Sequence, residues 1–321
     1  MATLTSLPDE LLAAIFSDVA ADVSAGHITT TVGPVCKLFH NLIQSSGIDV
    51  HYVFLLGVDS MRAFLAVILS RKMAQRRVHS LLIVADHDHR HSRENPTSDA
   101  SLVRTLQAII VNINPSLLHT LFMYSFSNNQ DENLTLHIPI SLPALTTLCL
   151  SGFVVTSSSP LSSLQSIQLL RLASLDEEYR NVPRLVVTLA PHATRLKLTF
   201  RTCAGAVATQ PVGYLNEFLR ATLLRKTGRT IPQFKNFPQS HAFPDSLTQI
   251  VLHCPNPELE DAHWGLMFTR SLQVVLMRAW RLLAEPLVLL SFTDEESEGE
   301  KQHVEELVEE WMQMNCDSKM M

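Results

Sequence analysis

Glycine is scarce in this sequence, with 10 residues among 321. Folds that bind dinucleotides or phosphates use glycine where the backbone must approach the ligand closely, so its scarcity disfavours them. The sequence also lacks GxSxG, P-loop, HExxH and protein-kinase motifs. Because no pattern points to catalysis, we expect a non-enzymatic protein that needs no cofactor.

Cysteine is also rare, and its spacing provides no CxxC pair for zinc or redox chemistry. The five cysteines are Cys36, Cys149, Cys203, Cys254 and Cys316. Such an odd, scattered set is typical of a reducing compartment. No basic segment precedes the first apolar residues, as it would in a signal peptide, and no apolar run reaches the ~18 residues of a membrane-spanning helix. We therefore expect a soluble protein of the cytoplasm or nucleus.

A basic excess is missing as well, since the formal net charge is −6. Proteins that bind nucleic acid usually carry basic residues that displace phosphate counterions. The one basic cluster, Arg71, Lys72, Arg76 and Arg77, is interpreted as a solvated helix end. We expect neither a nucleic-acid partner nor a membrane partner.

Metal ligation has one weak candidate, the alternating His87, His89 and His91. Imidazoles in an extended segment could chelate zinc, copper or nickel. Arg90 and Arg93 stand among them, however, and would repel a cation. A solvated polar loop without a metal is the preferred interpretation.

What the sequence has in abundance is apolar residues, 46% against 17% charged, enough for a large packed core.

The N-terminus predicts a helix, because Ser6 can cap it, Pro8 suits the first turn, and Asp9 and Glu10 favour the positive end of the helix dipole. Apolar residues then recur at spacings of three and four, which gives one apolar stripe. They are Leu11, Leu12, Ile15, Phe16 and Val19.

A second helical stretch follows Gly33-Pro34 and again has apolar residues on one face. These are Val35, Leu38, Phe39 and Leu42. Two short helices cannot bury all of their apolar surface on each other, and each exposed apolar side chain costs ~1.5–3 kcal/mol relative to burial. Their remaining faces must pack either on the rest of this chain or on another protein, and periodicity alone leaves both options open.

The residues of this segment resemble the F-box family in three places, Leu7–Leu12 (LPDELL), Ile15–Ser17 (IFS) and Val35–Lys37 (VCK). F-box modules are small helical units that bind the Skp adaptor of cullin–RING ubiquitin ligases. The resemblance covers residues 5 to about 50 and implies that this module binds such an adaptor. The implied adaptor-binding residues are Leu7, Pro8, Leu11, Leu12, Ile15, Phe16, Val35, Cys36 and Phe39.

The sequence departs from the F-box pattern in its middle. The stretch Ala20–Val32 is longer than is expected of the family, and Ile28–Val32 is β-branched and a poor helix former. Phe39 stands where tryptophan is common in the family.

A second pattern fills the body of the chain: apolar, two spacers, apolar, one spacer, apolar. It occurs at Val78-Leu81-Ile83, Leu118-Leu121-Met123, Leu145-Leu148-Leu150, Ile167-Leu170-Leu172, Ala193-Leu196-Leu198, Leu247-Ile250-Leu252 and Leu272-Val275-Met277. Several intervals fall in or near the ~20–29 residues of leucine-rich repeats. The body resembles a degenerate form of that fold, without the usual asparagine after the strand. A generic α/β domain is the alternative.

Helices are expected between these strands at 61–73, 102–113 and 214–224. The predicted organisation is an F-box-like module (1–50), an irregular α/β solenoid of parallel strands and helices (51–292), and an acidic linker with an amphipathic helix (293–321). We expect that last helix to cap the body.

Together these features predict a substrate-receptor subunit of a cullin–RING ubiquitin ligase. The module would bind the Skp adaptor, and the body would bind a target protein. One alternative is an interaction scaffold that keeps the F-box-like fold without ligase coupling. A cryptic hydrolase or transferase is another, for which a pocket of converging polar residues would be needed.

Overall fold

The structure is a computed structural model. It describes residues 4–22, 27–86, 97–126, 134–138, 140–156, 164–175, 182–200, 210–227, 243–255, 270, 274, 277, 288–293 and 300–317. The chain divides into two compact units. The first contains Met1–Leu145, Gly152–Ser163 and Glu298–Met321, and the second contains Thr146–Ser151 and Leu164–Ser297.

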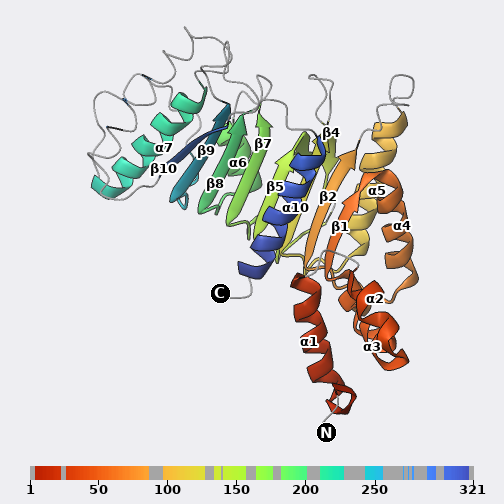
Figure 1. Ribbon diagram of the computed structural model, residues 1–321. Coiled ribbons are helices and arrows are strands. Elements are labelled where there is room, and N and C mark those ends of the chain that lie inside the picture. Colours follow the sequence, from red (N-terminus) through yellow and green to blue (C-terminus); the bar gives the residue numbers. More distant parts are fainter. Residues whose placement is uncertain are drawn as a thin grey trace. The chain divides into compact units, whose positions relative to one another are not determined.

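The first unit begins with a helical segment, residues 4–50, which we call the hook (Figure 1). Its helices are α1 (Asp9–Asp22), α2 (His27–Thr31) and α3 (Lys37–Ser46), with 3-10 turns at Leu4–Ser6, Gly33–Val35 and Ile48–Val50. Helix α1 starts as expected, with Asp9 and Glu10 in its first turn. The β-branched stretch after Ala25 forms the single-turn helix α2 despite its low helix propensity, because Ile28 is buried in the hook's core.

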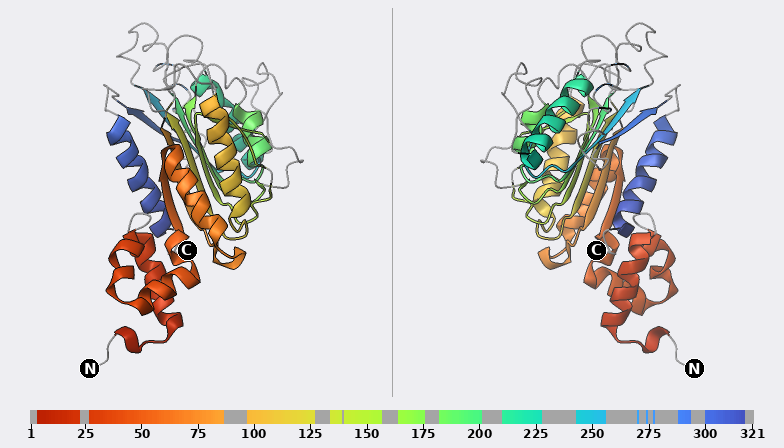
Figure 2. Two further views of the ribbon diagram at one scale, coloured as in Figure 1. Left: turned by 90° about the vertical axis from the view of Figure 1, so that its right-hand side faces the viewer. Right: turned by 90° about the vertical axis from the view of Figure 1, so that its left-hand side faces the viewer.

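Parallel strands and two helices follow the hook in the same unit. They are β1 (Tyr52–Leu56), α4 (Gly57–Ser70), β2 (Ser80–Asp86), α5 (Thr97–Asn112) and β3 (Thr120–Phe126), with a 3-10 turn at Met73–Gln75. The strands lie in sequence order, β1-β2-β3. Strands β4 (Leu134–His137) and β6 (Phe153–Thr156) form a separate parallel pair. Helices α4 and α5 pack against each other on one side of the strands (Figure 2).

Helix α10 (Glu300–Asp317) also belongs to the first unit and lies on the opposite side of its strands from α4 and α5 (Figure 2). It packs against β2 and against α1 of the hook. The predicted stripe is the buried face, because Leu307 and Trp311 are buried whereas Glu305, Glu306 and Glu309 are exposed. The acidic segment before it lies outside the described residues.

The second unit contains β5 (Thr147–Ser151), β7 (Leu169–Leu175), α6 (Val182–Leu189), β8 (Arg195–Phe200), α7 (Gln210–Thr227), β9 (Gln249–Pro255) and β10 (Val288–Thr293). Its strands are parallel and again lie in sequence order, β5-β7-β8-β9-β10. The positions of the repeated pattern that fall on β5, β7, β8 and β9, such as Leu170, Leu196 and Ile250, are buried. The α/β class with parallel strands and intervening helices is therefore confirmed.

The same hydrogen-bond pattern occurs where successive strands begin. In the first unit, the carbonyl of His51 accepts the N–H groups of His79 and Ser80, and the carbonyl of His79 accepts those of His119 and Thr120. In the second unit, Thr146, Gln168 and Thr194 repeat this role toward the next strand. The residue before β1, β2, β5, β7 and β8 is thus polar, and its carbonyl links that strand to the next one.

Six of the seven predicted strand motifs coincide with strands of the structure, namely β2, β3, β5, β7, β8 and β9. The seventh is wrong at Met277, which is helical and 55% exposed, whereas Leu272 and Val275 lie outside the described residues. An apolar triplet fits a buried strand and a helix alike, so this motif was ambiguous. The three predicted helices correspond to α4, α5 and α7, which begin four or five residues earlier.

Candidate protein-docking site

The hook has a hydrophobic core of its own. Its buried members are Leu12, Phe16, Ala20, Ile28, Phe39, Ile43 and Ile48. Phe16 and Phe39 meet edge to face, with ring centroids 4.9 Å apart, which is the preferred geometry for an aromatic pair. Helices α1 and α3 are therefore held together by side chains that come from the hook alone.

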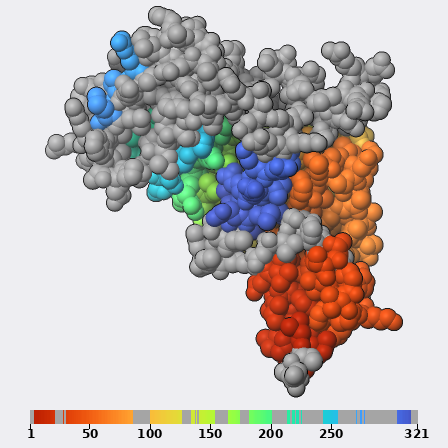
Figure 3. All heavy atoms as spheres, viewed as in Figure 1, coloured from red at the N-terminus to blue at the C-terminus, as the bar shows by residue number. Residues whose placement is uncertain are grey.

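Several apolar residues remain on the hook's surface after this core has formed. Leu11 is 53% exposed and Ile15 is 40% exposed, and they lie one turn apart on α1. Val35 is 66% exposed and Leu38, at the start of α3, is 40% exposed. Figure 3 shows the hook as the red part at the lower end of the surface. Exposed apolar residues of this density on a small module mark a candidate protein-docking site.

The nine residues implied by the F-box resemblance divide between surface and core. Pro8, Leu11, Ile15 and Val35 are exposed, and Leu7 and Cys36 are partly buried against the hook core. Leu12, Phe16 and Phe39 are buried inside it and offer no surface to a partner. Leu38 was missing from the implied set, although the sequence placed it on the same helical stripe.

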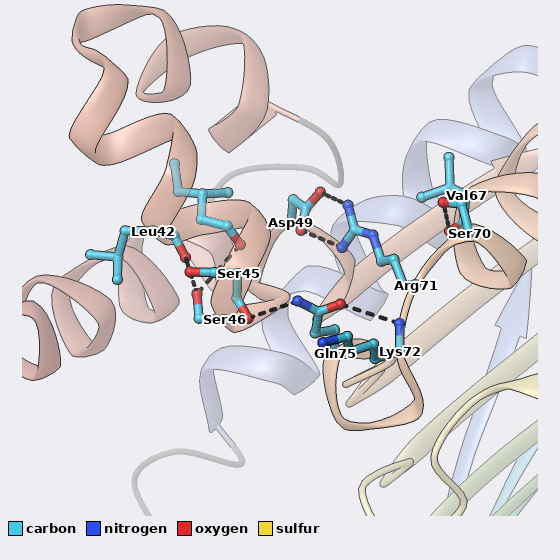
Figure 4. A network of polar contacts seen from close by, with 10 residues as sticks. Leu42, Ser45, Ser46, Asp49, Val67, Ser70, Arg71, Lys72 and Gln75 are labelled. Carbon is cyan, nitrogen blue, oxygen red and sulfur yellow. Dashed lines mark hydrogen bonds and ion pairs between the residues drawn. The ribbon is translucent and has the colours of Figure 1, made fainter.

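The hook is attached to the first helix and turn of the strand body by a polar network (Figure 4). Both carboxylate oxygens of Asp49 pair with the guanidinium of Arg71, one of them at 2.7 Å. Their side chains are only 9% and 13% exposed, so water screens this pair weakly. Gln75 donates from its amide to the carbonyl of Ser45 at 3.3 Å. The hook and body are thus joined by directional contacts as well as apolar ones.

A close backbone approach reinforces this junction. Gly47 ends α3 in the left-handed conformation, with φ of 72°. A Cβ atom at this position would clash with the backbone carbonyl oxygen of Gln75. Glycine is required here both by the conformation and by the contact.

Three imidazoles lie in a row at the same junction: His51 meets His79 edge to face, and His79 stacks on His119. His51 and His79 have ring centroids 4.7 Å apart, and His79 and His119 have centroids 5.9 Å apart. Burial lowers the pKa of His51 to about 3, and His79 and Arg77 act in the same direction. Burial likewise lowers the pKa of His79 to about 4, with His119 and Arg77 contributing. Both rings are therefore neutral near pH 7.

Ser17 and His51 share a hydrogen bond of 3.3 Å between Oγ and Nδ1. A serine beside a histidine is also the start of a nucleophile–base pair. The low pKa of His51 makes it a weak base, however, and its buried Nε2 has no hydrogen-bond partner that could orient it. The contact is better explained as a link between α1 and the start of β1.

The candidate metal segment, His87, His89 and His91, lies outside the described residues. Within the described part of the chain, no group of three His, Cys, Asp or Glu side chains is placed to hold a metal ion. None of the described helices is long and apolar enough to cross a membrane. No protein-family model, curated protein or solved structure matches the chain.

Proposed function

We propose that this protein is a substrate-receptor subunit of a cullin–RING ubiquitin ligase, in which the hook binds the Skp adaptor. One observation carries the proposal. The hook fills its own core with Leu12, Phe16 and Phe39, and it still leaves Leu11, Ile15 and Val35 exposed. The hook thus keeps an apolar surface that is available to another protein.

The F-box resemblance gives this surface a specific partner. The exposed residues Pro8, Leu11 and Ile15 fall within the LPDELL and IFS motifs, and Val35 falls within VCK. The buried residues of the same motifs then act indirectly, by fixing α1 against α3. In this proposal the adaptor contacts are Pro8, Leu11, Ile15, Val35 and Leu38, with Leu7 and Cys36 at the rim.

The strand body would serve as the target-binding part. Parallel strands in sequence order, with a polar residue before β1, β2, β5, β7 and β8, support a degenerate leucine-rich-repeat-like solenoid. In such a fold each repeat buries its apolar face only against its neighbours. The body would bring a target protein close to the catalytic subunits and would perform no catalysis itself.

Reconstitution tests this function. The purified chain is mixed with Skp adaptor and a cullin–RING core, and the mixture is resolved by size-exclusion chromatography. We expect a stable complex that contains all subunits. A chain that binds the adaptor alone and never joins the cullin core would support the scaffold alternative, and a chain that binds neither would contradict the proposal.

A further inference from the structure

The strands of the second unit have two chemically different faces. Leu196 and Leu198 of β8 are fully buried, on the side where α6 and α7 lie (Figure 2). Because side chains alternate along a strand, Arg195, Lys197 and Thr199 lie on the opposite face. The same alternation continues on the neighbouring strands, since β5, β7, β8 and β9 are parallel and their first residues are aligned. One face of this unit is therefore apolar, and the other is largely polar.

The polar face carries positive charge and no negative charge among its described residues, and we call it the basic strand face. Its members are Thr147, Cys149 and Ser151 of β5, Leu169, Arg171 and Ala173 of β7, Arg195, Lys197 and Thr199 of β8, and Gln249, Val251 and His253 of β9. The whole chain has a formal net charge of −6, so this face differs in sign from the protein as a whole. Such a surface attracts a partner of the opposite charge.

The corresponding strand face of the first unit is covered by the chain itself. Leu82 of β2 is fully buried there, and Trp311 of α10 donates its indole N–H to Ser80 at 2.7 Å. On β8, by contrast, Arg195 is exposed and Lys197 is partly exposed. Parallel sheets usually have two apolar, covered faces. The basic strand face departs from that rule at β8, where cations reach the surface.

The cations of this face lie close enough to reinforce one another. Strand register aligns Arg171 of β7 with Lys197, and neighbouring strands are about 4.8 Å apart. Arg195 precedes Lys197 by two residues, which places their Cα atoms about 6.6 Å apart on the same face. Arg171 is only 6% exposed, so water screens its charge weakly. The three side chains therefore concentrate positive potential over the first residues of β7 and β8.

We propose that the basic strand face binds an extended, acidic segment of a protein partner. Acidic side chains at alternate positions of such a segment are also about 6.6 Å apart, so two of them can face Arg195 and Lys197. The guanidinium of Arg195 can hold a carboxylate by two parallel hydrogen bonds. Thr199 and Gln249, which are partly exposed beside these cations, can donate hydrogen bonds to polar groups of the segment.

This inference rests on the proposed function in one respect, because it names the chemistry of the target that the strand body would bind. Its test needs neither adaptor nor cullin, so the two proposals can fail separately. Peptide binding without adaptor binding would support the strand-face inference and contradict the proposed function. Adaptor binding without peptide binding would have the opposite meaning.

Fluorescence anisotropy with short labelled peptides tests the inference on the full-length chain. The probe carries glutamate at alternate positions, and its matched control carries glutamine there. We expect the glutamate peptide to bind at least about ten-fold more tightly than the glutamine peptide, and its binding to weaken as salt is added. A third peptide with phosphoserine at these positions identifies the source of the negative charge. Tighter binding than that of the glutamate peptide indicates a phosphorylated target, and equal or weaker binding indicates an acidic one.

Charge reversal tests whether binding uses this face. The Arg195→Glu, Lys197→Glu chain should bind the glutamate peptide at least about ten-fold more weakly, and it should gain binding to a peptide with lysine at the same positions. That gain requires a folded chain. Arg104→Glu is the matched control, because Arg104 is an exposed arginine on α5 of the first unit, and it should leave binding unchanged. If the double variant does not fold, Arg195→Gln decides, with at least about three-fold weaker binding expected.

The proposal is overturned if the wild-type chain binds the glutamate peptide no better than the glutamine peptide. It is also overturned if the folded double variant, or Arg195→Gln in its place, keeps wild-type affinity, or if Arg104→Glu loses as much affinity as they do. Tighter binding of a single-stranded oligonucleotide of the same charge would contradict it as well, because the partner would then be a nucleic acid.

Discussion

Asp49 and Arg71 form a two-point ion pair that joins the hook to the helix α4 end of the strand body. Because both side chains are nearly buried, removing one partner leaves the other charge without compensation. We predict that Asp49→Ala lowers the free energy of unfolding by about 3 kcal/mol. Urea denaturation measures this change.

An exposed ion pair in the same unit provides the control. Asp59 and Arg62 lie 3.6 Å apart on the surface of α4, where water and salt screen them. Asp59→Ala should leave the unfolding midpoint unchanged. Equal destabilisation by both substitutions would mean that the Asp49–Arg71 contact does not hold the hook in place.

Gly47 provides a second test of the junction. Gly47→Ala forces a left-handed alanine, which costs about 1–2 kcal/mol, and adds a clash with the carbonyl of Gln75. Gly57 has a similar φ of 74°, and a Cβ added there would meet no atom within 4 Å. Gly57→Ala therefore carries the conformational cost without a clash. We predict a clearly larger drop in thermal midpoint for Gly47→Ala. Equal drops would contradict the close approach.

The buried imidazoles predict a pH dependence of stability. Folding lowers the pKa of His51 from 6.5 to about 3, so the unfolded chain binds more protons between these values. The stabilisation is complete above pH 6.5 and is lost as the pH falls through this window. We expect His51 to contribute up to about 1.4 kcal/mol per pH unit between about pH 6 and pH 5.

Replacing His51 separates its contribution to the pH dependence of stability from that of the carboxylates. Denaturation of the His51→Gln chain at several pH values should show a shallower slope than the wild type over the same range. Equal slopes in the two chains would show that His51 titrates normally in the folded state.

The hook's core and surface should respond differently to truncation. Phe16 is 2% exposed and pairs with Phe39, so Phe16→Ala leaves a cavity and should cost about 3–5 kcal/mol. Leu11→Ala removes a largely exposed side chain and should change stability by no more than about 0.5 kcal/mol. Thermal unfolding of both variants checks the division, and a large loss for Leu11→Ala would place that residue in the core.

Much of the strand body could be predicted from sequence, because alternating leucines such as Leu81 and Leu121 are buried as expected. Strand β1 was missed because only Gly57 separates its apolar run, Tyr52–Leu56, from the apolar residues of α4. The hydrogen-bonded polar residues at the starts of the strands were also missed, although His79, His119 and Thr194 occupy the same place in their motifs. The spacing of the apolar positions carries no information about the polar residue between them.

The candidate site was harder to predict in detail. A 3.6-residue stripe identifies the apolar side of α1, but it does not say which residues meet α3 and which meet solvent. That choice depends on the angle at which α1 crosses α3, where Leu12 and Phe16 enter the core and Leu11 and Ile15 do not. The link between Trp311 and Ser80 had no sequence signal, since long-range contacts leave no local pattern.

The measurement that tests the proposed function most directly is adaptor affinity, determined by calorimetry with purified Skp adaptor. The Leu11→Asp, Ile15→Asp chain places charge on the exposed side of α1 and spares the buried Phe16. Leu69→Asp is the control, because Leu69 on α4 is 54% exposed, much as Leu11 is. We predict at least about ten-fold weaker binding for the hook variant and unchanged binding for the control. Equal adaptor affinity of all three chains, or no binding by the wild type, would contradict the account.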